Sequence, residues 1–319
     1  MRRVLALAAE NLTTSQWHVL GSYCRAFATR GLDIRRSESL EAGPYLFSAG
    51  TPIAEKAPNC YWNWGDNSAV DADAGECAWI WHHGPRRPFP ADAPRLIVLP
   101  RNDLFEIRGV DNTPDGWAEY RSRIGVPWSE KCDEPYFLGT FTGSSGPDNV
   151  RVRACRLLQE SGLPANVGLT AGSIPPELHF DVPLKEREPL YVMGQHKFVL
   201  SLWGNHQFNP RLYRGLEAGS LVFHQATPDI QLLDDGILVP GVHYVEIAPD
   251  LSDLLEQVEY FVAHPGEARE IAEAGHRRWM DRLFVSEPCT LPDVIWERFT
   301  SQPGWPAFRA AFDVHPPPA

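Results

Sequence analysis

Short apolar runs alternate with amphipathic stretches along this chain, which is the pattern of a parallel sheet covered by helices on both faces. In the first half, four apolar runs predict strands: RVLALAA, YLFSAG, AWIWHH and RLIVLP. Residues 13–31 have apolar positions at helical spacing and end in a glycine, which predicts a helix. Residues 85–127 are rich in proline and glycine and are predicted to be mostly loop.

The second half alternates more clearly. The runs PYFLGTF, KFVLSLWG, SLVFHQ and GVHYVEIA predict four strands. Amphipathic stretches predict helices over 148–162, 209–219, 250–265 and 266–283. Polar residues suited to cap the first three helices are Asp148, Asn209 and Asp250, and glycines suited to end the first two are Gly162 and Gly219.

Length and pattern together predict an α/β fold with two domains, because 319 residues are too many for one small core. The N-terminal domain is expected over residues 1–131 and the C-terminal domain over 132–284. Residues 285–319 are proline-rich at both ends. We expect them to form a tail that packs back on the N-terminal domain.

Composition narrows the possible partners. The formal charge of −12 argues against a nucleic acid or an anionic membrane as a partner, because the net charge of the protein would repel it. Neither the cysteines nor the histidines have metal-binding spacing, so we expect no metal and no cofactor. The apolar run at residues 4–9 is shorter than a signal peptide needs, and no run approaches the roughly 20 apolar residues of a membrane span. These features predict a cytoplasmic protein with reduced thiols.

The strongest candidate chemistry lies in KFVLSLWGNHQFNPRLYRGLEAGSLVFHQ, residues 197–225. In an open α/β sheet, ligands bind beyond the carboxyl ends of the strands, where helices begin. Asn209 and the proline after it define such a helix start, whose unpaired N–H groups favour an anion. Arg211 adds a guanidinium that can hold phosphate oxygens at two points. The alternative is a surface ion pair between Arg211 and Glu217.

The predicted helix separates functional from structural positions. Gly215 lies four residues after Arg211 on the same face and is expected to leave room for a ligand. Leu212 and Leu216 lie on the other side and are expected to bury against the sheet.

A second candidate anion site is GTFTGSSGPDNVRVR, residues 139–153. It is also a strand, a turn of small residues and a helix start, and it contains Arg151 and Arg153. It has neither the P-loop order nor the GxGxxG of a dinucleotide fold, and such a loop alone is usually only a loop. Two such edges in one half, both with arginine, are consistent with one diphosphate held between them.

The order and spacing of these motifs resemble the C-terminal half of glycosyltransferase family 90, the capsule-associated and protein O-glucosyltransferase-like group. The resemblance rests on residues 197–225, on PYFLGTFTGSSG and on the stretch ILVPGVHYVEIAPDLSDLLEQVEYFVAHPGEAREIAEAG. It implies a GT-B-like fold in which two Rossmann-like domains face a central cleft. The C-terminal domain would bind a nucleotide sugar and the N-terminal domain the acceptor. It also implies inverting, metal-independent transfer, with UDP-glucose or UDP-xylose as the donor.

By position, the resemblance implies that Arg211 contacts the diphosphate. The loop at Ser144 has no arginine where the family often has one, so Arg151 or Arg153 is the expected substitute. The residues expected at the nucleotide sugar are Gly143, Ser144, Ser145, Arg151, Arg153, Lys197, Asn205, Phe208, Arg211, Gly219 and Ser220.

Inversion needs a general base to take the proton of the acceptor hydroxyl, and the resemblance assigns that role to an aspartate in the N-terminal half. Asp66 is the first candidate because it lies in an aromatic-rich segment, and Asp71, Asp73 and Glu76 follow closely. Two other functions stay open. One is a sugar-nucleotide epimerase or hydrolase on the same plan, and the other is a non-catalytic nucleotide- or carbohydrate-binding protein.

Overall fold

In the first 100 residues, the computed structural model describes the backbone of six short strands. From residue 122 to residue 283, it describes most of the chain. The described residues are 4–8, 33–37, 45–47, 60–63, 79–82, 96–98, 122–144, 146–173, 176, 183–186, 190–204, 209, 211–227, 238–283, 300–301 and 306. The chain divides into two compact units, the first made of Met1–Ile107, Asp229–Leu233 and Glu287–Ala319, and the second of Arg108–Pro228 and Asp234–Ser286. The predicted borders at residues 131 and 284 and the docking of the tail stay predictions.

The first unit contains a parallel sheet with the strand order β2-β1-β3-β4-β5-β6. The strands are β1 (Val4–Ala8), β2 (Asp33–Ser37), β3 (Tyr45–Phe47), β4 (Cys60–Asn63), β5 (Trp79–His82) and β6 (Leu96–Val98). The four runs predicted as strands correspond to β1, β3, β5 and β6. The other two strands were not predicted, because β2 is mostly polar and β4 lies inside the aromatic-rich segment.

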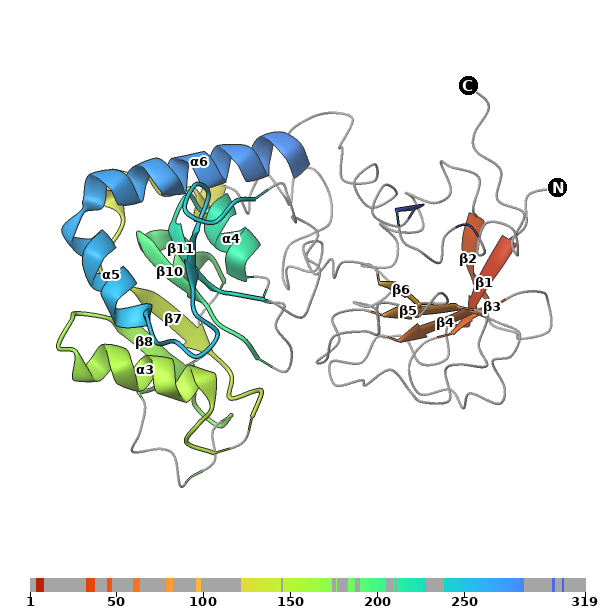
Figure 1. Cartoon of the computed structure of the whole chain (residues 1–319), viewed down its shortest axis with the longest axis horizontal. Coiled ribbons are helices and arrows are strands. Elements are labelled where there is room, and N and C mark those ends of the chain that lie inside the picture. The colour runs from red at the N-terminus through yellow and green to blue at the C-terminus, as the bar shows by residue number, and fades with distance from the viewer. Residues whose placement is uncertain are drawn as a thin grey trace. The chain divides into compact units, whose positions relative to one another are not determined.

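The second unit has a six-stranded parallel sheet in the order β12-β11-β10-β7-β8-β9, with helices along it (Figure 1). Its strands are β7 (Tyr136–Gly139), β8 (Asn166–Thr170), β9 (Leu184–Lys185), β10 (Phe198–Ser201), β11 (Leu221–Gln225) and β12 (Val245–Ile247). Its helices are α3 (Val150–Glu160), α4 (Arg211–Glu217), α5 (Leu254–Ala263) and α6 (Pro265–Leu283), with short 3-10 turns at Trp128–Glu130 and Leu190–Gln195. The strands at β8 and β9 were not predicted.

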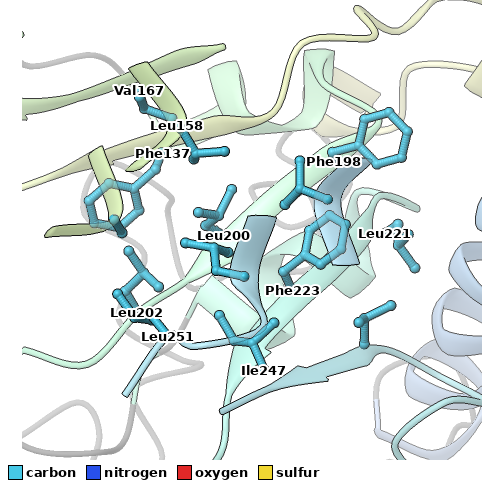
Figure 2. Packing of buried hydrophobic residues seen from close by; sticks show 14 of the residues in the cluster. Phe137, Leu158, Val167, Phe198, Leu200, Leu202, Leu221, Phe223, Ile247 and Leu251 are labelled. Atoms are coloured by element: carbon cyan, nitrogen blue, oxygen red, sulfur yellow. The ribbon is translucent and has the colours of Figure 1, made fainter. Parts of the chain in front are cut away.

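Alternate side chains of these strands point to opposite faces of the sheet. On one face, Phe137, Phe198 and Phe223 pack with Leu158 of α3 and Val258 of α5 in a buried core (Figure 2). Burying apolar surface on this scale is the main stabilising contribution to such a unit. Within the described residues, no helix is long and apolar enough to cross a membrane.

The opposite face is covered by α4, and one prediction about this helix is wrong. Leu212 and Leu216 are buried as expected. Gly215, however, does not face a ligand: a Cβ added to it would lie 2.4 Å from Cγ2 of Val222 on β11. The glycine is therefore needed for close packing of the helix on the sheet, because no side chain fits there.

The ends of the helices follow local capping rules, with two corrections. Gly219 has a φ of 66°, and Ser220 N–H donates to Gly215 O, which is the expected glycine-terminated end of α4. The cap of α3 is Asn149 rather than Asp148, and the residue before α5 is Asp253 rather than Asp250. The predicted caps stand one and three residues too early.

Candidate functional site

The strand order of the second unit reverses between β7 and β10. From β7 the chain adds β8 and β9 on one side, and then returns to add β10, β11 and β12 on the other. The two strands at the reversal are paired directly, with Val199 opposite Tyr136. Numbered from β7, this is the Rossmann order 3-2-1-4-5-6, in which ligands bind outside the carboxyl ends of the strands at the reversal point. The loops after β7 and β10 are the two stretches that the sequence predicted as anion sites.

These two loops touch through glycines. Gly143, in the loop after β7, has a φ of 100°, and a Cβ added to it would lie 2.7 Å from the carbonyl oxygen of Gly204 in the loop after β10. A Cβ added to Gly204 would in turn lie 2.5 Å from Nη2 of Arg151. Both positions therefore lack a side chain so that the backbones and the guanidinium can approach closely.

Arg151 lies in the first turn of α3 and is 7% exposed. Its Nε donates to the carbonyl oxygen of Trp203 at 2.7 Å, and its Nη1 donates to the carbonyl oxygen of Thr140 at 2.7 Å. The side chain thus starts at the β7 edge of the site and is anchored in the loop after β10.

Arg211, at the start of α4, makes the reciprocal connection. Its Nη2 donates to the carbonyl oxygen of Leu138 on β7 at 2.5 Å. The ring of Phe137 lies under both guanidiniums, with its centroid 5.1 Å from Cζ of Arg211 and 6.0 Å from Cζ of Arg151. We call this arrangement the arginine brace: Arg151 and Arg211, each bonded to a carbonyl oxygen of the opposite strand or loop.

The brace concentrates positive charge. Burial and, as a smaller cause, the charge of Arg211 lower the pKa of Arg151 to about 9. Burial also lowers the pKa of Arg211 to about 10, which Tyr136 partly opposes. Both guanidiniums stay charged at neutral pH. Two adjacent cations, one buried and one partly buried, favour an anionic ligand, since an opposite charge offsets both the cost of desolvation and the mutual repulsion.

The described residues offer the brace no carboxylate. No ion pair joins Arg211 to Glu217 there, and the hydrogen-bond acceptors of both arginines are the carbonyl oxygens above and the Asn209 side chain. Among the same residues, no hydrogen bond uses Nη2 of Arg151 or Nε of Arg211, so each guanidinium has an N–H donor beyond the bonds named above. No three metal-ligating side chains cluster in the described part of the chain.

Gln225, at the end of β11, fixes the loop that receives Arg151. It is fully buried, and its Oε1 accepts the backbone N–H of Trp203 at 2.8 Å. Its Nε2 donates to the carbonyl oxygen of Pro249 at 2.7 Å. Sequence reasoning did not predict Gln225, although its place at the end of an apolar run was a usable signal.

Several residues expected at the nucleotide sugar lie away from the brace. Lys197 precedes β10, at the amino edge of the sheet, and its Nζ lies 2.5 Å from Asp133 Oδ1. Gly219 and Ser220 precede β11 at the same edge, and Ser220 Oγ donates to a backbone carbonyl at 2.7 Å. Arg153, by contrast, lies two residues after Arg151 on α3, and its guanidinium donates to the carbonyl oxygen of Asp250, beyond the carboxyl end of β12, at 2.8 Å. Because parallel strands share a direction, residues before a strand lie at the edge opposite Arg211.

The remaining expected residues divide in two groups. Gly143 and Ser144 lie in the loop after β7, where Ser144 is exposed and its carbonyl oxygen accepts a hydrogen bond from Asn149. The others lie outside the described residues: Ser145, Asn205, Phe208 and the candidate bases Asp66, Asp71, Asp73 and Glu76.

His224, beside the site on β11, gives a testable pH dependence. Burial lowers its pKa to about 4, and the only hydrogen bond that its ring makes in the described residues joins Nδ1 to Ser201 Oγ at 3.0 Å. Between pH 6.5 and 4 the unfolded chain therefore binds a proton that the folded chain does not, so stability should fall by up to about 3 kcal/mol as the pH drops. Urea unfolding at several pH values measures this.

The variant His224→Asn should flatten the pH dependence between pH 6.5 and 4, because asparagine does not titrate there. The matched control is His264→Asn, which removes an exposed imidazole on the same unit and should leave the slope unchanged. Equal slopes for wild type and His224→Asn would contradict the assignment.

The chain resembles known glycosyltransferases in sequence. Residues 171–284 match the profile of a family described as glycosyl transferase-like. An uncharacterized protein of Frog virus 3, protein 027R, is 28% identical over 194 residues, covering 49% of this chain and 20% of the viral protein. Human protein O-glucosyltransferase 3 is 26% identical over 235 residues, covering 70% of this chain and 43% of the enzyme. The chain thus spans less than half the length of either relative.

Solved structures extend the likeness to both units. HepE of Anabaena in complex with UDP-glucose has a TM-score of 0.52 at 11% identity, covering 94% of this chain and all of HepE. An α1,3-fucosyltransferase with GDP has a TM-score of 0.57 at 10% identity, covering 93% of this chain and 89% of the enzyme. At these identities the likeness concerns the fold, and the predicted GT-B fold of two parallel α/β units is confirmed. The cleft between the units stays a prediction.

Proposed function

We propose that this protein is a glycosyltransferase that moves a sugar from a nucleotide sugar to an acceptor hydroxyl, with the diphosphate held by the arginine brace. The observation that carries the proposal is the brace itself: a buried guanidinium, Arg151, beside a partly buried one, Arg211, at the reversal point of a Rossmann-ordered sheet, both bonded to uncharged carbonyl oxygens. The match of residues 171–284 to a glycosyl transferase-like family supports it.

The proposed chemistry uses the brace for the leaving group. The acceptor oxygen forms a bond to the anomeric carbon while the bond from that carbon to the diphosphate oxygen breaks. Negative charge then builds on the diphosphate, where Arg151 and Arg211 can stabilise it more strongly than in the bound donor. Attack from the opposite face inverts the anomeric centre.

The donor and the base are the finer parts of this proposal. We infer UDP-glucose or UDP-xylose as donor, a choice supported by the likeness to a protein O-glucosyltransferase and to HepE with UDP-glucose. The proposed base is a carboxylate of the N-terminal half, with Asp66 first and Asp71, Asp73 and Glu76 next. The transfer is proposed to need no metal.

Calorimetry of the full chain with UDP, GDP and uridine tests the proposal. We expect UDP to bind and uridine to bind at least about tenfold more weakly, because uridine lacks the diphosphate. Equal affinities for UDP and uridine would show that the brace is not part of the donor site.

Incubation with UDP-glucose alone then separates the alternatives, since fast, complete turnover without an acceptor indicates a hydrolase or epimerase. Binding without turnover on any acceptor indicates a binding protein.

A further inference from the structure

A repeated unit flanks the reversal point of the second sheet. Residues 149–151 are Asn-Val-Arg and residues 209–211 are Asn-Pro-Arg, and the two follow β7 and β10, respectively. In each, the asparagine Oδ1 accepts the backbone N–H of the arginine, at 2.9 Å for Arg151 and 3.0 Å for Arg211. Both asparagines are almost fully buried. The same local bond thus fixes the backbone from which each guanidinium extends.

Each asparagine also binds the loop that precedes it. Nδ2 of Asn149 donates to the carbonyl oxygens of Thr142 at 2.9 Å and Ser144 at 2.7 Å. Nδ2 of Asn209 donates to the carbonyl oxygen of Leu202. One side chain therefore fixes both the course of a loop and the start of the helix that follows.

The bonded loop atoms are next to the parts of the brace. Gly143, which contacts Gly204, lies between the two carbonyls bound by Asn149. Leu202 directly precedes Trp203, whose carbonyl oxygen accepts the bond from Arg151. Asn209 Oδ1 also lies 3.5 Å from Nη1 of Arg211, so it contacts the guanidinium as well as the backbone.

Helix capping alone does not require asparagine at these positions. Serine, threonine and aspartate cap helices about as well, through a side-chain oxygen. Of these residues only asparagine adds an NH₂ group that can donate to loop carbonyls. At both positions the asparagine NH₂ group donates to a loop carbonyl, and helix capping does not explain these bonds.

We propose that Asn149 and Asn209 are positioning residues that set the geometry of the two guanidiniums and thereby the affinity for a diphosphate. This inference rests on the proposed function, because it assigns the brace to a diphosphate. Without the amide donors, the loops lose their fixed course, and the carbonyl acceptors that orient the guanidiniums move. A misaligned pair of guanidiniums then forms fewer of the charge-assisted hydrogen bonds that give phosphate affinity.

The test uses Asn149→Ser and Asn209→Ser in the full chain. Serine keeps the capping oxygen and removes the NH₂ donors. We expect each variant to bind UDP and inorganic pyrophosphate about tenfold more weakly, with uridine affinity unchanged, when measured well below the unfolding midpoint. A purely structural cap would lower the midpoint but leave UDP affinity in the folded protein unchanged.

The control is Asn166→Ser, at the amino edge of the same sheet, where the Asn166 side chain contacts His196 and Lys185. It should lose stability and keep the parent's UDP affinity. If a serine variant does not fold, the threonine variant at the same position, which also caps and fills more of the buried space, replaces it.

The outcomes separate the two claims. If the serine or threonine variants bind UDP as the parent does, the positioning role is overturned and the proposed function stands. If the parent chain itself does not bind UDP or pyrophosphate, the proposed function is overturned, and this inference with it. A selective loss for UDP and pyrophosphate over uridine supports both.

Discussion

Arg211→Gln should raise the dissociation constant for UDP by about 100-fold or more. The glutamine removes one of two adjacent charges from a partly buried site, and with it the hydrogen bond from Nη2 to Leu138 O. Removing one partner of a hydrogen-bonded charge pair typically costs about 2–5 kcal/mol, and a 100-fold change corresponds to about 2.7 kcal/mol. Isothermal calorimetry at low ionic strength measures the change.

Two further variants separate charge from geometry. Arg211→Lys keeps the charge but not the planar fork, so an intermediate loss is expected. Arg277→Gln removes an exposed charge on α6, whose side chain is 64% exposed, and should leave UDP affinity unchanged. Because Arg211 also holds β7, a thermal melt must show that the variants fold. A folded Arg211→Gln with the parent's affinity would mean that the diphosphate binds elsewhere.

Trp279→Ala should lower the free energy of unfolding of the second unit by about 3–5 kcal/mol. Trp279 of α6 is fully buried, and its ring stacks on Tyr213 of α4 with centroids 4.5 Å apart. Alanine removes this contact and leaves a cavity between two helices that pack closely. Urea unfolding followed by circular dichroism measures the loss, and the transition of the second unit is the one that should shift.

Two control variants should lose less stability than Trp279→Ala. Trp279→Phe keeps an aromatic ring over Tyr213 and should cost less than half as much as the alanine variant. Tyr260→Ala removes a 44% exposed ring from α5 and should cost no more than about 1 kcal/mol. A small effect of Trp279→Ala, similar to that of Tyr260→Ala, would show that α6 is not held by this contact.

The part of the fold that local patterns specify was predictable from the sequence. The strand before Asn209, the cap itself and the glycine end at Gly219 all depend on residues near one another in the chain, and the structure contains each of them. The strand at β8 was missed because Gly168 interrupts its apolar run, and a Cβ at this position would lie 2.7 Å from the carbonyl oxygen of Pro183. That requirement comes from a neighbouring segment, so no local pattern reveals it.

The candidate site was predictable only in part, for a similar reason. The sequence indicates two loops with arginine, but the strand order that brings Arg151 and Arg211 together depends on long-range pairing. Lys197 was assigned to the nucleotide sugar through its match to the family pattern, and that assignment stays a prediction. Its position before a strand already places it at the opposite edge. The repeated Asn-x-Arg unit was visible in the sequence and was overlooked.

The uncharged partners of the arginine brace have a consequence for turnover. An arriving polyanion displaces no carboxylate, and the guanidiniums are already oriented, so little conformational entropy is lost on docking. If the brace holds the diphosphate as proposed, departure of the spent nucleotide is expected to be slow, because no carboxylate among the described residues competes for the two cations. Mobile ions from the solvent are then the natural competitors. If product exit limits the proposed transfer, moderate ionic strength should therefore raise its rate.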